Sequence, residues 1–212
     1  LLLEHDADMK SVSLGCIAEC FDKELMRYYL DRWDTVGTSD GLTDIVTAKA
    51  YPLIGLIREY APRIPNHKAQ LGAALNQFID EESMKWVSLA MWMGADPRLP
   101  APTRLGDDSD PDEWMTPLAY ALLCASVPAL KLIKPSAERD DLNALLGSVS
   151  YWRDEGYDVA EYLLGLGANV NNKGNGGSSI IDGLLRPGFE VSYSGISRTS
   201  VSVYRLESWI KR

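Results

Sequence analysis

Residues 157–171 read YDVAEYLLGLGANVN, an amphipathic helical segment that closes on Gly167-Ala168-Asn169. Glycine and asparagine tolerate the left-handed backbone that ends many helices, so this triplet marks a helix stop. A second copy stands at residues 84–97 (MKWVSLAMWMGADP), and a third opens the chain at residues 1–8 (LLLEHDAD). A supersecondary unit that recurs along a chain predicts a repeat architecture. Such an architecture favours a role in binding over a role in catalysis.

The hydrophobic pattern is helical almost throughout and falls into pairs of short segments. Pro52 and Pro128 stand at expected helix starts, because proline is tolerated in the first turn of a helix. The expected helices cover residues 11–20, 22–33, 41–50, 51–60, 68–80, 82–93, 116–126, 127–134, 141–153, 157–166 and 178–185. The pairs end near residues 7, 34, 61, 95, 134 and 168, at intervals of 27, 27, 34, 39 and 34 residues. Steps scattered around about 33 residues predict an array of helix-turn-helix repeats.

Thr116-Pro117-Leu118, the alanine-rich residues after it and the Gly-Ala-Asp/Asn endings resemble the ankyrin-repeat family. The threonine at that place caps the first helix, and the proline occupies its first turn. The resemblance is strong at residues 84–97, 116–133 and 157–185 and weak at residues 11–62. The family's usual histidine after Thr-Pro-Leu is Ala119 here, so its loop-tethering hydrogen bonds must be replaced or missing.

The resemblance implies an all-α solenoid of about five to six degenerate repeats over residues 1–186, beginning with a partial repeat. Residues 187–212 would then form an irregular C-terminal cap or a docking tail, because a terminal repeat must cover an exposed apolar face. A HEAT-like or mixed helical solenoid is the competing architecture. The regular 34-residue step and the Trp-Leu-Gly-Tyr pattern of tetratricopeptide repeats are absent.

The composition is acidic: the 212 residues carry a net charge of −9. This argues against nucleic-acid binding, which rests largely on clustered Lys and Arg, and it favours a basic partner. We expect no membrane span, because no apolar run is long enough. The first residues resemble the tail of a helix, so we expect a fragment of a longer chain. Three cysteines (Cys16, Cys20 and Cys124) are too few for a disulfide framework, and we expect small buried thiols in a reducing compartment, cytoplasmic or nuclear.

The clearest departure from the repeat is the insertion at residues 97–115, which is rich in proline and acidic residues. Its candidate binding residues are Asp107, Asp108, Asp110, Asp112 and Trp114. The stretch reads either as a solvated loop or as an acidic finger that offers Trp114 as an aromatic anchor to a basic partner. Calcium binding is a third interpretation, but the alternate ligand spacing and terminal glutamate of a helix-loop-helix calcium site are missing.

A second departure is an enlarged first helix in the fifth unit, expected over residues 142–155. If this helix protrudes, Trp152 and Arg153 are interface anchors, since both residue types dominate interface energetics. If it does not protrude, Trp152 belongs to the core.

The sequence contains no catalytic motif, and its two histidines, His5 and His67, lie far apart. We therefore expect no catalytic residues, no cofactor and no metal. The ankyrin resemblance implies a monomeric module that binds another protein through its concave face and inter-repeat loops. The candidate contacts implied are Arg98, Trp114, Met115, Tyr120, Leu123, Asn171, Asn172 and Lys173. Two alternatives remain: a targeting or regulatory part of a larger enzyme, and a spacer with intramolecular contacts.

Overall fold

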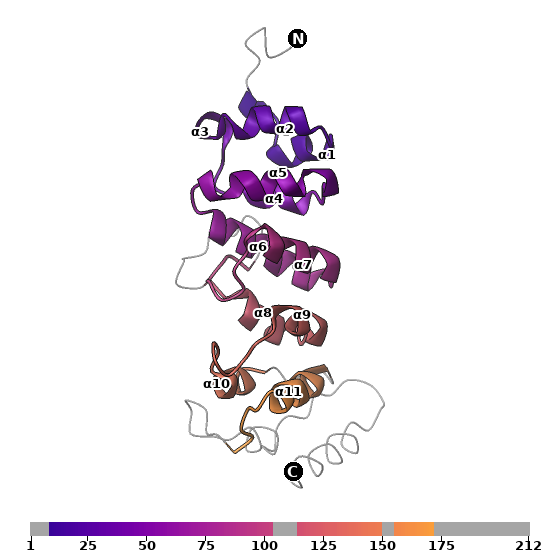
Figure 1. Cartoon of the computed structure of the whole chain (residues 1–212), viewed down its shortest axis with the longest axis vertical. Coiled ribbons are helices and arrows are strands. Elements are labelled where there is room, and N and C mark those ends of the chain that lie inside the picture. Colours follow the sequence, from indigo (N-terminus) through magenta and orange to yellow (C-terminus); the bar gives the residue numbers. More distant parts are fainter. Residues whose placement is uncertain (1–8, 104–113, 150–154, 172–212) are drawn as a thin grey trace, which may run out of the picture.

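The computed structural model describes residues 9–103, 114–149 and 155–171, and within these ranges it is helical with no β-strand (Figure 1). The α-helices are α1 (Leu14–Glu19), α2 (Lys23–Leu30), α3 (Trp33–Val36), α4 (Gly41–Thr47), α5 (Ile54–Tyr60), α6 (His67–Asp80), α7 (Met84–Met93), α8 (Pro117–Leu123), α9 (Val127–Ile133), α10 (Leu142–Gly147) and α11 (Glu155–Gly165). Short 3-10 turns are η2 (Met9–Ser11), η3 (Tyr51–Leu53) and η4 (Ala61–Arg63). The prediction of an all-α chain is confirmed over these ranges.

The helices form two rows along the long axis of the molecule. In one row, which we call the inner row, α4 packs between α1 and α6, and α6 packs in turn on α8. In the other row, the outer row, α2, α5, α7, α9 and α11 follow one another, each in contact with the next. Cross-contacts join α6 to α7, α8 to α9 and α10 to α11, so each pair forms a layer. Figure 1 shows these layers in chain order from α1 and α2 to α10 and α11.

The tight turns inside four successive layers share one backbone geometry. Each contains a non-glycine residue in the left-handed region, with φ between 52° and 56°: Phe21, Lys49, Glu82 and Ala125. The N–H of each residue donates to the carbonyl three residues earlier, at 3.0–3.1 Å: Ala18, Val46, Ile79 and Leu122. A left-handed conformation disfavours side chains with a Cβ atom. Its recurrence therefore reflects the tertiary packing of each helix pair and not local preference.

The outer-row helices α7 and α11 end alike, at the glycines that the sequence predicted. Gly94 has a φ of 116° and Gly167 a φ of 104°. The next residue in each case, Ala95 or Ala168, donates its N–H to a carbonyl five residues earlier. Asp96 and Asn169 then each accept the N–H of the residue two positions on, which turns the chain out of the helix.

Side-chain caps start several helices. Thr116 Oγ1 accepts the N–H of Ala119 at 3.1 Å, and Pro117 is the first residue of α8, as predicted. Asp22 and Asp141 cap α2 and α10 through two backbone N–H groups each. Such caps satisfy N–H groups that have no partner inside the helix.

The core runs continuously through the layers, and α6 lies at its centre. Leu71, Leu75 and Phe78 of α6 are completely buried because α4 and α8 cover two sides of the helix and α7 a third. Each such side chain stabilises the fold by about 1.5–3 kcal/mol relative to its exposed state. The buried side chain of Gln70 joins α6 to α4 by accepting the N–H of Leu42 at 2.8 Å.

Three expectations differ from the structure. The helix expected over residues 142–155 ends at Gly147, because Ser148 caps it with backbone and hydroxyl bonds to Ala144 O. The helix expected over residues 22–33 ends at Leu30, and Trp33 begins the separate helix α3. Cys16 and Cys20 are exposed, and Cys124 is half-buried. The prediction of buried thiols was wrong for the first two, which lie on a part of α1 that its described neighbours α2 and α4 leave exposed. The expected helix 178–185 and tail 187–212 lie outside the described residues.

Candidate interaction surface at the loop edge

The connections between layers gather along one edge of the molecule, where the outer-row helices end and the inner-row helices begin. We call this the loop edge and define it by residues 31–40, 61–66, 94–103, 114–116 and 134–141. Helix α3 and the described ends of the insertion mark this edge on the left of Figure 1. Three of the fourteen residues that the sequence singled out for binding belong to it: Arg98, Trp114 and Met115.

The two ends of the insertion are fixed to each other and to α6. Ala101 and Met115 exchange both backbone hydrogen bonds, at 3.1 and 3.2 Å, and form an isolated antiparallel bridge. Ala101 is fully buried and lies so close to Gly72 that a Cβ atom at position 72 would be 2.5 Å from the Ala101 Cβ. Asn76, also fully buried, donates its side-chain N–H to Pro102 O at 2.9 Å. We call residues 101, 102, 114 and 115 the stem.

The stem and the part of α6 beneath it hold polar atoms whose hydrogen bonds are incomplete. Within the described part of the chain, Trp114 Nε1 and Asn76 Oδ1 are buried and have no hydrogen-bond partner. A buried donor or acceptor in this state costs about 1–3 kcal/mol. Trp114, which one interpretation of the sequence offers as an aromatic anchor, is half-exposed, and its indole N–H faces into the protein. The indole therefore contributes to the stem as well as to the surface.

Arg98 lies in an ion pair that joins two neighbouring layers. Its Nε and Nη2 atoms donate to Asp140 Oδ1 and Oδ2, both at 2.8 Å. The Asp140 side chain is 5% exposed, and its Oδ2 also accepts the N–H of Ser136 at 2.9 Å. The hydrogen bond from Arg98 is the main reason that the pKa of Asp140 lies below its ordinary value. The guanidinium that the sequence offered to a partner is thus already engaged within the molecule.

Tyr120 and Leu123 lie on α8, as the resemblance implied. Leu123 is 54% exposed and available for contact. Tyr120 is half-buried, and its hydroxyl donates to Asp80 Oδ1 at 3.4 Å. Burial, followed by the proximity of Cys124 and Asp80, raises the pKa of Tyr120 to about 12, so the side chain remains a neutral hydrogen-bond donor.

The other predicted contacts are only partly described. Asn171 is exposed, and its backbone N–H bonds to the Asn169 side chain. Eight of the candidate binding residues lie outside the described ranges: Asp107, Asp108, Asp110, Asp112, Trp152, Arg153, Asn172 and Lys173.

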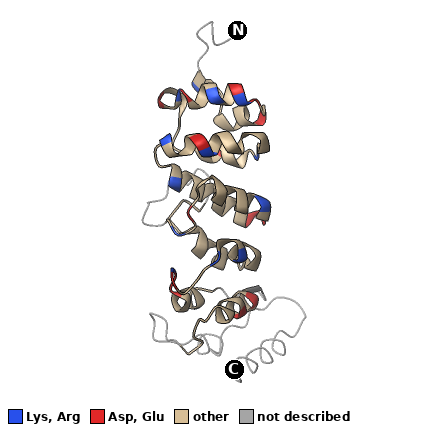
Figure 2. Ribbon diagram, viewed as in Figure 1, with Lys and Arg blue, Asp and Glu red and all other residues tan. Residues whose placement is uncertain are grey.

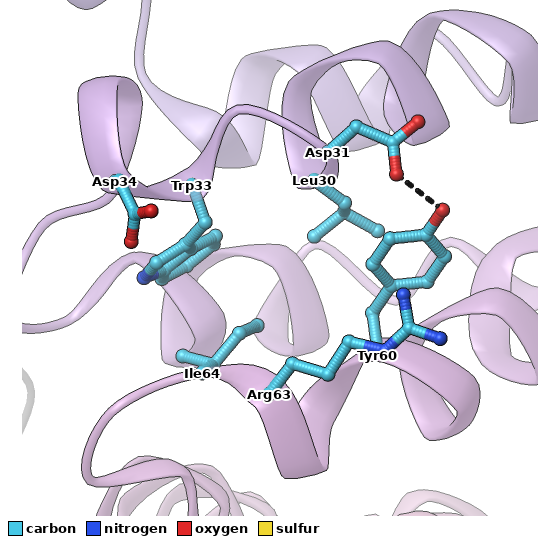
Figure 3. A pocket seen from close by; sticks show the side chains of 7 residues that line it. All are labelled: Leu30, Asp31, Trp33, Asp34, Tyr60, Arg63 and Ile64. Atoms are coloured by element: carbon cyan, nitrogen blue, oxygen red, sulfur yellow. Dashed lines mark hydrogen bonds between the residues drawn. The ribbon is translucent and has the colours of Figure 1, made fainter.

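A groove that the sequence did not reveal lies at the loop edge, between the first two layers. It has a volume of about 190 Å³. Its lining comes from the ends of α2 and α5, the start of α3, and η4: Leu30, Asp31, Trp33, Asp34, Tyr60, Arg63 and Ile64. Figure 3 shows the Trp33 and Tyr60 rings on opposite sides, with Arg63 and Ile64 along the lower wall. No local motif could have indicated it, because Asp31 and Tyr60 are 29 positions apart in sequence.

Acidic and basic side chains are interspersed over the layers (Figure 2). Searched over the described residues, the structure contains no group of three or more His, Cys, Asp or Glu side chains that could hold a metal ion. None of the described helices has the length and apolar character needed to cross a membrane. No family model matches the chain, and no curated protein and no solved structure is significantly similar to it. The ankyrin resemblance therefore depends on the residues of the chain itself.

Proposed function

We propose that this chain is a degenerate ankyrin-like repeat array that binds a partner protein through its loop edge. The repeat architecture is supported by the two rows of helices, by the shared left-handed turn and by the matched helix ends at Gly94 and Gly167. The Thr116-Pro117 start of α8 has the capping geometry for which the motif is known.

The anchored stem of the insertion is the observation that carries the binding proposal. A solvated loop without a role needs no fixed base, whereas here Asn76 of α6 bonds to Pro102 at the first end, and the buried Ala101 ties the second end to the first through its bridge to Met115. A fixed base lowers the ordering cost that a partner must offset when it binds the loop. The residues between the two ends include four aspartates and a glutamate, so the partner surface is basic.

Two other roles remain candidates on the same observations. The chain can be the targeting or regulatory part of a larger enzyme, or a spacer whose contacts are intramolecular. The spacer role gains support from the Arg98–Asp140 pair, which shows that one predicted contact residue serves the fold.

Affinity capture from a lysate of the source organism, followed by mass spectrometry, tests the proposal. The test variant replaces Asp107, Asp108, Asp110 and Asp112 with Asn. The control variant removes the same number of charges at exposed sites outside the loop edge, by Gln substitution of Glu19, Glu24, Glu82 and Glu161. We expect a partner that the wild type and the control retain and the test variant loses. Equal capture by all three proteins would move the interface elsewhere, and no specific capture would favour the spacer.

A further inference from the structure

The groove between the first two layers has rigid aromatic walls. The Trp33 indole packs against two glycines: a Cβ atom at Gly37 would lie 2.4 Å from the Trp33 Nε1, and one at Gly41 would lie 3.0 Å from the ring. Any larger residue at position 37 would displace the indole. The opposite wall, Tyr60, is 7% exposed and fixed by the hydrogen bond from its hydroxyl to Asp31 Oδ1 at 2.6 Å.

The groove already accommodates one cation. The guanidinium of Arg63 lies 5.0 Å from the centroid of the Tyr60 ring, close enough for a cation–π interaction. Figure 3 shows it on the side of the groove that carries Tyr60 and Asp31, whereas Asp34 lies beside Trp33 on the other side. Arg63 is thus paired with the Tyr60 ring, and an aromatic ring and a carboxylate stand together again on the Trp33 side without a cation among the lining residues.

The charges of the lining do not balance. Asp31 and Asp34 are acidic and Arg63 is the single basic residue of the lining, which leaves one negative charge. Outside the lining, Arg27 and Glu59 also lie near Tyr60, one basic and one acidic residue whose formal charges cancel. The volume of about 190 Å³ is below the roughly 300–1,000 Å³ of pockets for drug-sized ligands. It suits the end of one long side chain.

We propose that the groove binds an alkylguanidinium or alkylammonium group, with its charge at Asp34 and its methylene chain against Trp33. The source can be an Arg or Lys side chain of the partner or a free amine. The first source rests on the proposed function, because it extends the basic partner surface from the insertion to the first two layers of the same edge. The affinity of the groove for the cation does not rest on it.

The test is an NMR titration of the full chain that follows the indole N–H resonance of Trp33, assigned with a Trp33→Phe variant. The probes are N-acetyl-arginine N-methylamide, N-acetyl-lysine N-methylamide and, as the uncharged analogue of arginine, N-acetyl-citrulline N-methylamide. We expect the two cationic probes to shift the resonance with dissociation constants in the millimolar range, as befits one exposed ion pair with an aromatic contact. The citrulline probe should bind at least about fivefold more weakly.

Two matched variants test whether the cation binds at Asp34. Asp34→Asn should weaken the binding of both cationic probes about fivefold, whereas Glu24→Gln, which removes an exposed charge on the preceding helix α2, should leave it unchanged. Both substitutions are at exposed positions, and equal urea midpoints will show that both variants fold. Equal shifts with citrulline, no shift at 50 mM probe (roughly ten times the expected constant), or an unaffected Asp34→Asn variant would overturn the proposal.

Two further comparisons distinguish a peptide side chain from a free amine as the ligand, and the groove proposal from the proposed function. Tighter binding of acetyl-Gly-Arg-Gly-amide than of agmatine indicates a peptide side chain, and the reverse indicates a free amine. Cation binding that survives while affinity capture finds no partner would refute the proposed function and leave the groove assignment standing. Capture of a partner without cation binding would do the opposite.

Discussion

The ion pair between Arg98 and Asp140 should stabilise the fold more than the ion pair between Lys49 and Glu81. Both are short, at 2.8 and 2.6 Å, and both join neighbouring layers. They differ in burial and geometry. The Arg98 and Asp140 side chains are 25% and 5% exposed and make two parallel hydrogen bonds, whereas Lys49 and Glu81 are 38% and 33% exposed and make one.

The expected magnitudes follow from these differences. An exposed single-bonded pair is worth about 0.2–1 kcal/mol. A bidentate Arg–carboxylate pair with one buried partner should reach about 2 kcal/mol, because charge-assisted bonds to a buried group contribute about 1.5–3 kcal/mol. The lowered pKa of Asp140 agrees in direction with a stabilising ion pair. Its stabilisation should be fully present above the unfolded-state pKa near 3.9 and be lost as the pH falls through the lower folded-state pKa.

Two double-mutant cycles measured by urea unfolding provide the assay. The first uses Arg98→Met, Asp140→Asn and the double variant, and the second uses Lys49→Met, Glu81→Gln and their double variant. We expect a coupling free energy of about 2 kcal/mol in the first cycle at pH 7 and pH 5, and of about 0.5 kcal/mol or less in the second. The first coupling should shrink below pH 4.

Equal coupling free energies in the two cycles would refute the reasoning, because burial and bidentate geometry would then add nothing. A coupling in the first cycle that persists unchanged at pH 3 would contradict the assignment of Asp140 as the group responsible.

Two further predictions concern the turns and the stem. Glu82→Gly should raise the free energy of unfolding by about 0.5–1 kcal/mol, because glycine adopts the left-handed backbone conformation at φ 53° without strain. The control Glu59→Gly, at an exposed position of helix α5, should lower the free energy of unfolding by about 1 kcal/mol. A loss of stability with Glu82→Gly would show that this turn is not left-handed in solution. Gly72→Ala should lower the free energy of unfolding by about 1 kcal/mol, because the new Cβ would overlap that of Ala101. The control Gly55→Ala adds a Cβ in open space on α5 and should raise the free energy of unfolding by about 0.5–1 kcal/mol. Thermal or urea unfolding measures both variants, and equal gains in stability would mean that the stem does not rest on α6.

Features of the fold that local sequence encodes were predictable. The Thr116-Pro117 pair caps α8 through groups within three residues of each other, and Gly94 and Gly167 end their helices through backbone geometry that glycine supplies. The segmentation into paired helices follows from the apolar period alone. These features need no knowledge of the neighbouring layer.

What depends on packing between layers was not predictable. Phe21, Lys49 and Glu82 adopt left-handed turns although none is a typical turn residue, because the two helices of each layer must pack against each other. The engagement of Arg98 requires Asp140, which is 42 positions away.

The groove shows the same limit. Trp33 was expected at the end of one helix over residues 22–33. Its position as a groove wall follows only from the end of α2 at Leu30 and the packing of α5 alongside. The exposure of Cys16 and Cys20 depends on which sides of α1 the helices α2 and α4 cover, and composition does not reveal this.

A peptide-display selection against the folded chain tests the central claim, that the loop edge recognises a basic protein segment, most directly. The library presents random 16-residue peptides without bias in charge, and selected peptides are measured against the wild type, the variant with four loop aspartates changed to Asn, and Asp34→Asn. The account predicts enriched peptides that combine Arg or Lys with apolar residues and that lose affinity for both variants, more so as salt is raised. Enriched peptides that are neutral or acidic, or that bind both variants as tightly as the wild type, would contradict it.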